Sequence, residues 1–326
     1  MPALSVILCT HNPREDFLQR VLDGLRTQTL PLADWELLLV DNGSKNPVSE
    51  KFNLAWHPHA RHVREEELGL TPARLRGIRE SAADILVFVD DDTVLAPDYL
   101  EQALAVGNEW PFVGAWGGSV IPEYETPLPN WVGDEVWRLT VVDIKEDLWS
   151  NLREGFTTLP CGAGLCFRRS VGASYQERCR LQKKAAAFDR KGNELTGYGD
   201  MDLGHCALDI GLGTGKSIKL HLTHLIPAGR LTLDYFVRHA EGDATSMMLF
   251  RASRGLPVSE PKPMSWLGQL RWFLHRLKTR MPREQYEIQK AHHRGLEKGY
   301  RMATEWLASK QNSEPDTHKV GSVKVD

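Results

Sequence analysis

The sequence predicts an α/β fold in which a mostly parallel sheet is covered by helices on both faces. Short apolar runs rich in β-forming residues alternate with amphipathic helical patterns over residues 1–109, an order typical of parallel strands joined by helices. The composition agrees with this prediction, because 41% hydrophobic and 25% charged residues in a chain of 326 are typical of a globular protein.

The elements of this first part follow from local patterns. Asn12 is expected to cap the first helix, with Pro13 at its first helical position and Glu15 completing a capping box. Thr71 is expected to cap the second helix, and a third helix is expected at 96–106. Apolar runs predict strands at residues 3–10, 35–41, 60–63 and 85–89.

The pattern changes after Glu109. Residues 111–133 are rich in Gly, Pro and Trp and are expected to form loops. "TLPCGAGLCFRRS" reads as a glycine-rich turn into a short strand, and a helix is expected from Asp200 to a stop at Gly211. A linker at 257–263 should separate this part from helices at 265–280 and 283–308.

We therefore expect one large domain over residues 1–256, divided into a ligand-binding half at 1–109 and a second half at 110–256. Residues 257–310 would form a helical extension, and the polar tail at 311–326 is expected to be disordered.

Charge and cysteine content exclude several classes of protein. A net charge of −3 without a basic excess argues against a nucleic-acid partner. No apolar run approaches the roughly 20 residues of a membrane span. The five cysteines form no CxxC pair, which predicts reduced thiols in a cytoplasmic protein and argues against a Cys-ligated metal.

Three predicted strands end in polar residues, namely Thr10, Asp41 and Asp90. Ligands of open α/β sheets bind outside the carboxyl ends of the strands, so these side chains are expected to converge on one ligand. The alternative is that each residue only forms a local turn, since Asp and Asn are common in turns.

The run Asp90, Asp91 and Asp92 places three acids after an apolar strand. Carboxylates are ligands of Mg²⁺ or Mn²⁺, which complete their coordination shells with phosphate oxygens and water. Together with Asp41 and Arg74, the triplet favours a nucleotide-diphosphate site over an exposed acidic turn.

These motifs, taken in order, resemble those of the bacterial family 2 glycosyltransferases. The resemblance covers roughly Leu4 to Ala240 and implies the GT-A fold, a nucleotide-binding α/β domain. The segments that carry it are "SVILCTHN", "LLLVDNGS", "LGLTPARLRGI", "ILVFVDDDTVL", "PCGAGLCFRRS" and "GYGDMDL".

The resemblance implies a role for each donor-site residue. Thr10 and the following turn, including Asn12, would lie along the nucleotide. Asp41 would recognise the base, and Arg74 would face the diphosphate. Asp90 and Asp92 match the ends of the DxD motif, with Asp90 facing ribose or metal and Asp92 ligating the metal. Asp91 is its variable middle residue.

The resemblance also implies that Asp200 is the catalytic base. Gly199 stands where the family often has Glu, and Asp202, two residues after Asp200, is the alternative base. Gly164 and Glu67 stand where Asn is frequent, which leaves sugar recognition open.

Four further features of the sequence bear on function. The pattern H-x-I-P-x-x-R at 224–230 resembles a segment of related enzymes, which implies that His224 is a metal ligand; a structural role is the alternative. Arg230 is either a phosphate contact or a surface arginine. "GLGTGKS" (211–217) lacks P-loop spacing and is expected to be a helix stop and turn. Trp131 is expected to contact the acceptor, whereas most of Trp116, Trp137 and Trp149 are expected to lie in the core.

The resulting expectation is a metal-dependent inverting glycosyltransferase that uses a nucleotide-diphospho-sugar, with UDP expected, and a glycan or lipid-linked acceptor. A sugar nucleotidyltransferase and a non-catalytic glycan-binding or scaffold protein are the alternatives. The basic, Trp-containing segment 264–283 suits peripheral contact with the inner face of a membrane. Packing on the domain, or a homodimer through 264–310, is the other interpretation.

Overall fold

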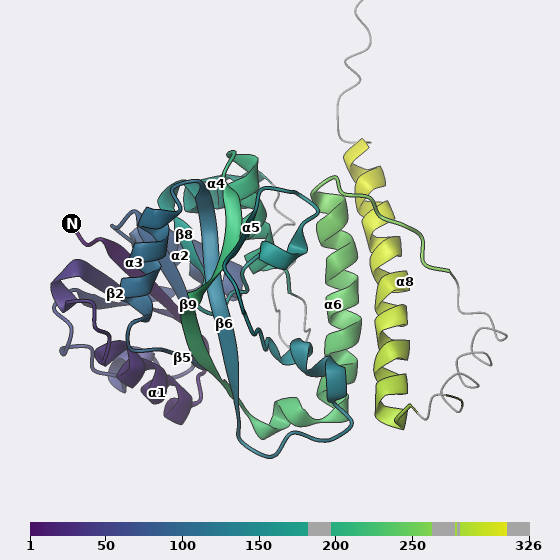
Figure 1. The fold of residues 1–326 in the computed structure, drawn as a ribbon, viewed down its shortest axis with the longest axis horizontal. Helices are drawn as coiled ribbons and strands as arrows, with labels where there is room; N and C mark the ends of the chain where they lie inside the picture. The colour runs from purple at the N-terminus through teal and green to yellow at the C-terminus, as the bar shows by residue number, and fades with distance from the viewer. Residues whose placement is uncertain (182–196, 263–277, 279–280, 312–326) are drawn as a thin grey trace, which may run out of the picture.

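The computed structural model describes residues 1–181, 197–262, 278 and 281–311, which form a mixed sheet with helices on both faces (Figure 1). The strand order is β3-β2-β1-β4-β8-β6-β9-β5, and β7 pairs with β9. The strands are β1 Leu4–Thr10, β2 Trp35–Asn42, β3 Ala60–Glu65, β4 Ile85–Asp90, β5 Thr93–Leu95, β6 Val113–Tyr124, β7 Leu148–Ser150, β8 Cys166–Arg168 and β9 Gly213–Ile226. The α-helices are α1 Glu15–Arg26, α2 Leu70–Glu80, α3 Tyr99–Glu109, α4 Arg169–Leu181, α5 Gly199–Asp209, α6 Leu233–Ser253 and α8 Arg283–Gln311.

The predicted α/β fold is confirmed, and its first four strands in space are parallel. Side chains of β1 alternate between two cores, as the pleat requires. Leu4, Val6 and Leu8 pack with α1 and α3, whereas Ile7 and Cys9 pack with α2, α4 and α5. A strand covered on both faces must be apolar throughout, which explains the apolar run in the sequence.

The expectation of loops over residues 111–133 is wrong for much of that range, because β6 occupies Val113–Tyr124. The strand pairs with β9 through a register shift between Gly117 and Ser119. A side chain at Gly118 would place its Cβ 1.9 Å from the Leu220 carbonyl oxygen. The glycines that resemble a loop in the sequence therefore allow a β-bulge.

Only part of the expected turn at 211–217 is confirmed. Gly211 ends α5 in the left-handed region with φ +80°, as expected for a helix stop. The chain then enters β9 at Gly213 and continues in that strand to Ile226.

Two predicted helix caps are also wrong. Asn12 has φ +48°, and its side-chain oxygen accepts a hydrogen bond from the Lys45 N–H instead of capping α1. The helix begins at Glu15, without a side-chain cap hydrogen bond. α2 begins at Leu70, so Thr71 lies inside its first turn.

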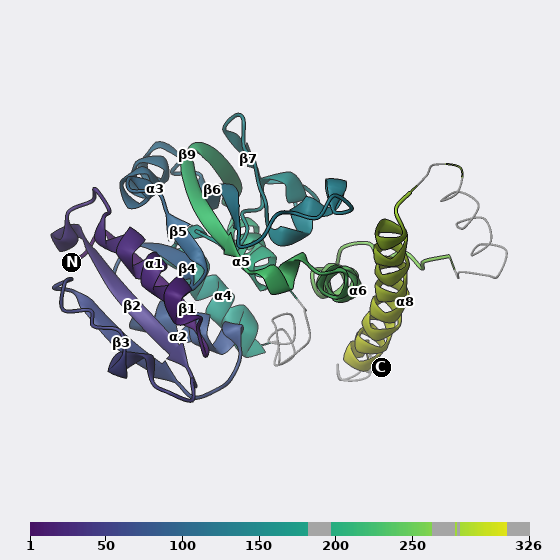
Figure 2. The same ribbon diagram turned by 90° about the horizontal axis from the view of Figure 1, so that it is seen from below.

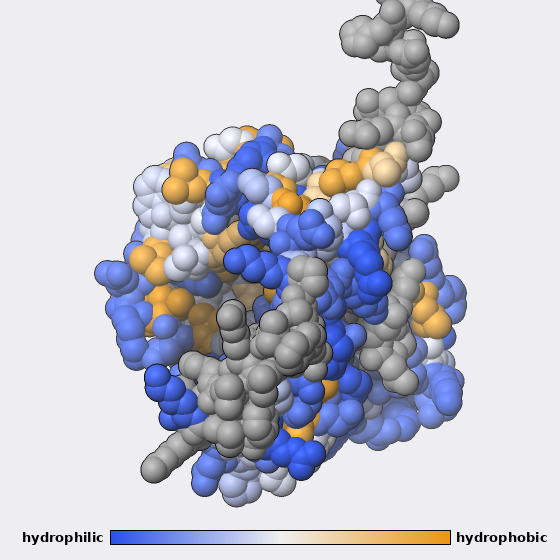
Figure 3. All heavy atoms as spheres, turned by 90° about the vertical axis from the view of Figure 1, so that its right-hand side faces the viewer, coloured by the Kyte–Doolittle hydropathy of each residue, from blue (hydrophilic) through white to orange (hydrophobic). Residues whose placement is uncertain are grey.

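α6, which the sequence patterns did not predict, packs along α8 on one side of the sheet (Figures 1 and 2). The two helices approach closely because α8 presents Gly295 and Gly299 to α6. A third apolar cluster joins both helices to the segment before β7 through residues that include Leu139, Phe236 and Ile288. On the side of the molecule that bears α8, the coloured surface is mostly hydrophilic with scattered apolar residues (Figure 3).

The predicted linker at 257–263 is largely confirmed, since residues 257–262 have no regular secondary structure. α8 confirms the predicted helix at 283–308. The helix predicted at 265–280 and the disordered tail predicted from 311 lie almost wholly outside the described residues. Within the described part of the chain, none of the helices combines the length and apolar character needed to span a bilayer.

Gly295→Ala should destabilise the protein although alanine favours helix formation. A Cβ at this position would lie 2.3 Å from the Glu241 carbonyl oxygen, so the helices must separate. We expect a loss of about 1–3 kcal/mol in the free energy of unfolding, measured by denaturant titration. Gly229→Ala is the control, because its Cβ would meet nothing within 4 Å. A Gly295→Ala protein as stable as wild type would contradict this account of the helix packing.

Candidate active site

The three polar strand ends meet at one edge of the sheet, as predicted. Thr10 lies beside Asp41 in the β1–β2 register, and Cys9 lies beside Asp90 in the β1–β4 register. The Thr10 hydroxyl donates to the carboxylate of Asp91. Burial, and then the neighbouring Asp92 carboxylate, raises the pKa of Asp91 to about 7 despite that hydrogen bond.

Asp41 is buried, and its carboxylate organises the turn after β2. The Ser44 N–H donates to Asp41 Oδ1 at 2.9 Å, and Arg64 Nη1 donates to Oδ2 at 2.6 Å. Burial alone would raise the pKa of Asp41, but the hydrogen bonds from Ser44, Val48 and Arg64 outweigh it and lower that pKa. Arg64 was missed in the sequence because no local pattern connects β3 to a strand-end acid.

Asn12 lies in the neighbouring turn, after β1. Its backbone N–H donates to the Ser44 hydroxyl at 2.9 Å. The turns that follow β1 and β2 are thus joined by hydrogen bonds, and they place Asn12 beside the turn that Asp41 holds.

Arg74 and Asp200 come together at Gly162. Arg74, only 4% exposed, lies with Nη2 3.6 Å from Asp90 Oδ1. A Cβ at Gly162 would lie 2.6 Å from Arg74 Nη2 and 3.4 Å from Asp200 Oδ2. Because residue 162 is glycine, the end of β4, helix α2 and the start of α5 can approach one another closely.

Asp200 stands at the first turn of α5 with both carboxylate oxygens oriented by backbone amides. The Gly162 N–H donates to Oδ2 at 2.7 Å, and the Met201 N–H donates to Oδ1 at 2.8 Å. The side chain remains partly exposed. Each oxygen therefore keeps acceptor capacity for a further proton donor.

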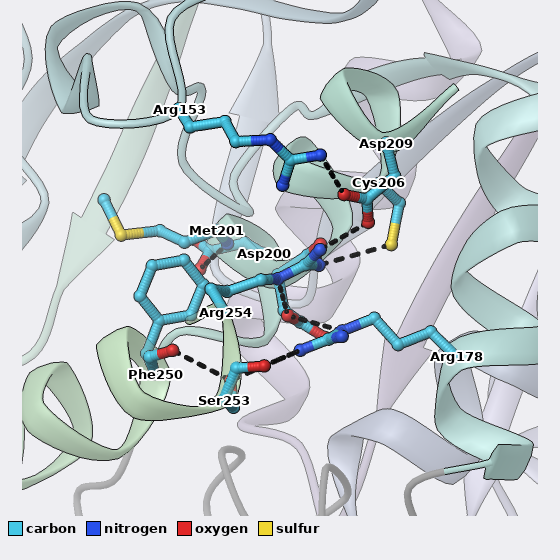
Figure 4. A network of polar contacts seen from close by, with 10 residues as sticks. Arg153, Arg178, Asp200, Met201, Cys206, Asp209, Phe250, Ser253 and Arg254 are labelled. Carbon is cyan, nitrogen blue, oxygen red and sulfur yellow. Dashed lines mark hydrogen bonds and ion pairs between the residues drawn. The ribbon is translucent and has the colours of Figure 1, made fainter. Parts of the chain in front are cut away.

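Asp202 has a different environment, although it lies only two residues away, because it pairs with Arg178 and Arg254, which Figure 4 shows close to each other near Asp200. It is 1% exposed. Arg178 Nε lies 2.9 Å from both of its oxygens, and Arg254 Nε donates to Oδ1 at 2.6 Å. Arg254 also donates to Asp209 at the other end of α5. Asp202 thus joins α4, α5 and the end of α6 through buried ion pairs.

His224 and Arg230 both lie against Asp92. β5 starts directly after Asp92 and pairs with β9, which brings Thr93 into register with His224. His224 Nε2 lies 3.6 Å from Asp92 Oδ2, and Arg230 Nη2 donates to the same oxygen at 2.9 Å. His224 Nδ1 donates to the Leu139 carbonyl at 2.9 Å, which leaves Nε2 as the acceptor nitrogen.

The tryptophans depart in part from expectation. Trp116 is fully buried, as predicted, but Trp137 and Trp149 are 48% and 55% exposed. Trp131, predicted to contact the acceptor, packs edge-on against Phe236 with ring centroids 5.1 Å apart. It lies on the apolar cluster beneath α6 and α8.

Asp202→Asn should cost far more stability than Asp234→Asn. Removing the Asp202 charge leaves two largely buried guanidiniums without their main counter-ion, a change that typically costs about 3–5 kcal/mol. Asp234 forms an exposed pair with Arg238, worth about 0.5 kcal/mol or less. Denaturant titration of both variants measures the difference. Equal stabilities would contradict the structural role of Asp202.

The sequence is similar to those of known glycosyltransferases. The sequence profile described as "Glycosyl transferase family 2" matches residues 5–171. "Glycosyltransferase AglE" of Haloferax volcanii is 30% identical over 138 residues, which are 39% of this chain and 45% of that protein. "Glucosyl-dolichyl phosphate glucuronosyltransferase" of the same organism is 25% identical over 173 residues, 52% of this chain and 53% of that protein. The chain thus spans about half the length of these relatives.

Among solved structures, S. aureus TarS in complex with UDP-GlcNAc aligns with 95% of this chain and 92% of that one, at 12% identity and a TM-score of 0.48. A likeness at that level does not bear on function. The profile covers about half of the chain, across the strand ends, Arg74, the aspartate triplet and Gly162. The chain therefore belongs to glycosyl transferase family 2.

Proposed function

We propose that the protein transfers a sugar from a nucleotide-diphospho-sugar to a hydroxyl group of a glycan or lipid-linked acceptor, with inversion at the anomeric carbon. UDP is the proposed nucleotide. The observation that carries the proposal is the meeting of Arg74, Asp90 and Asp200 around Gly162. The Arg74 guanidinium, which suits a diphosphate, and the Asp200 carboxylate, which can accept a hydroxyl proton, thereby face the same space.

The donor side of this space is built from the strand ends. Asp41 and Asn12 shape two adjoining turns where the nucleoside would lie. Arg74 supplies a largely buried guanidinium, which matches phosphate oxygens well. Its Nη2 lies 3.6 Å from Asp90 Oδ1, so the guanidinium stands at the strand end where a diphosphate would lie.

Asp200 is the proposed general base. In an inverting transfer, the acceptor oxygen forms a bond to the anomeric carbon, the bond from that carbon to the diphosphate breaks, and Asp200 takes the hydroxyl proton. Asp202 is a poor alternative because Arg178 and Arg254 engage its buried carboxylate.

Retention by a covalent intermediate would need a nucleophile near the sugar. Cys161, next to Gly162, is a weak choice, because burial and then the Asp200 carboxylate raise the pKa of its thiol to about 12. A protonated thiol is a poor nucleophile, so Cys161 gives no support to a covalent route.

A divalent cation is proposed at Asp92 and His224, beside Asp90. Within the described residues no group of three metal-ligating side chains forms a preformed cage. Asp92 and His224 lie close enough to share an ion, and Mg²⁺ or Mn²⁺ commonly takes few protein ligands when phosphate and water supply the others. When bound, the ion would stabilise negative charge on the leaving diphosphate. Arg230, now paired with Asp92, is positioned to contact the same phosphates.

Asp92→Asn should sharply lower turnover and should weaken UDP binding only when Mn²⁺ or Mg²⁺ is present. We expect this because the substitution removes the Asp92 carboxylate, which is proposed to bind the Mn²⁺ or Mg²⁺ ion. Turnover assays and UDP titrations with metal or EDTA measure both effects. Asp84→Asn is the control. Asp84 is exposed and directly precedes β4, at the end of that strand away from Asp92. Full wild-type activity in EDTA would contradict metal dependence.

Asp200→Asn should leave donor binding unchanged and lower sugar transfer by about 10²-fold or more, the usual scale for losing a general base. UDP titration and initial rates with a panel of nucleotide sugars measure the two quantities, and slow donor hydrolysis would identify the sugar. Asp234→Asn, which changes an exposed carboxylate paired with Arg238 on α6, is the control. The base would instead be Asp202 if Asp200→Asn transferred sugar at the wild-type rate while Asp202→Asn lost more transfer activity than its lower stability explains.

A further inference from the structure

Arg230 contacts both side chains of the proposed cation site. Its Nη2 donates to Asp92 Oδ2 at 2.9 Å, and its Nη1 lies 3.0 Å from His224 Nε2. Because His224 Nδ1 donates to the Leu139 carbonyl, Nε2 carries a lone pair and accepts from the guanidinium. Two nitrogens of one arginine thus engage the same two atoms that are proposed to bind a divalent ion.

Backbone hydrogen bonds bring these two acceptor side chains together. The Leu225 N–H donates to the Asp92 carbonyl at 2.8 Å, and Thr93 lies in register with His224. The side chains of Asp92 and His224 are only 14% and 6% exposed. An ionised carboxylate with so little access to water is costly without a positive partner, and Arg230 supplies a positive charge here.

The short helix that carries Arg230, Ala228–Leu231, is anchored through other residues. The Ala228 N–H donates to Glu125 Oε2 at 2.7 Å, and Leu231 is buried in the apolar cluster beneath α6 and α8. The Arg230 side chain, in contrast, is 22% exposed. Its guanidinium can therefore change partner by rotation about side-chain bonds while the helix stays in place.

A metal ion and an N–H donor cannot use the same lone pair at the same time. The neutral imidazole of His224 has a single acceptor nitrogen, so a divalent ion can bind Nε2 only after Arg230 leaves it. A diphosphate offers charged oxygens that pair well with a guanidinium. Binding of a diphosphate thus gives Arg230 a new partner and leaves Asp92 and His224 available to the ion.

From these contacts we propose that Arg230 is an internal cation that competes with the divalent metal for Asp92 and His224, and that the donor diphosphate releases it. Metal alone then binds weakly, whereas metal and nucleotide strengthen each other's binding, because coupling between two ligands is reciprocal. The inference rests on the proposed function, because it concerns the proposed cation site and the diphosphate of the donor.

Arg230→Met is the principal test, because it removes the guanidinium and keeps a long side chain. Without nucleotide, Mn²⁺ should bind this variant about 10-fold or more tightly than it binds wild type, the scale of one hydrogen bond to a charged group. Titration followed by the electron paramagnetic resonance signal of free Mn²⁺ measures both affinities without turnover. Equal Mn²⁺ affinities of the two proteins would overturn the proposal.

Arg238→Met is the matched control for the loss of one positive charge. Arg238 forms an exposed pair with Asp234 on α6, so its substitution leaves Arg230 on Asp92 and His224. The Mn²⁺ affinity should therefore equal that of wild type. If Arg238→Met tightened Mn²⁺ binding as much as Arg230→Met does, a general effect of charge would explain both results and the proposal would be wrong.

Thermal unfolding provides a second measurement. In EDTA, Arg230→Met should unfold at a lower temperature than wild type, because Asp92 loses a positive partner. Mn²⁺ should raise the unfolding temperature of this variant more than that of wild type, since a ligand stabilises the folded state according to its affinity. A loss of stability that Mn²⁺ does not reverse would contradict the exchange of one cation for the other.

Mn²⁺ titrations with saturating UDP test the release of Arg230 by a diphosphate. UDP should tighten Mn²⁺ binding in wild type, and this gain should be about 10-fold smaller in Arg230→Met, which has no guanidinium to displace. An equal gain in both proteins would overturn the inference. Absence of Mn²⁺ binding with or without UDP would overturn the proposed cation site as well. Mn²⁺ binding that Asp92→Asn abolishes but Arg230→Met leaves unchanged would overturn the inference alone.

Discussion

The close approach of three chain segments at Gly162 is the constraint on which the active site depends. Any side chain at this position would have to occupy the space between Arg74 and Asp200. The Gly162 N–H also orients one oxygen of Asp200. Because Arg74 is tied to Asp90 at the end of β4, a single residue without a side chain sets the separation between the donor side of the site and its proposed base.

Around this point the two halves of the site are supported in different ways. The donor side rests on parallel strands whose register brings Thr10, Asp41 and Asp90 to one edge. The base side rests on helices, since α5 is held by buried ion pairs from Arg178 and Arg254. Strand register is fixed by the backbone ladder, whereas the position of α5 depends on side chains from elements far apart in the sequence.

That difference explains how much the sequence could predict. Apolar runs identified β1, β2 and β4 and hence the converging acids, and family motifs pointed to Asp200. β6 was missed because the glycines of its bulge resemble a loop. α6 was missed because it is buried on several sides, against α5, α8 and the segment before β7, and so lacks a single apolar stripe. Arg64 and Arg254 could not be found, because only the folded chain brings them to Asp41 and Asp202.

The strand order has a consequence for how the protein forms during synthesis. β4 ends at Asp90, but the strand that covers its free edge, β8, begins only at Cys166. A nascent chain that has left the ribosome as far as α3 therefore exposes an unpaired strand edge, the feature through which partly synthesised chains associate. The strand ends proposed to face the donor belong to that early part, whereas α6 ends at Ser253, just before Arg254, which pairs with Asp202 of α5. Translation thus completes the donor side well before the proposed base can be held in place.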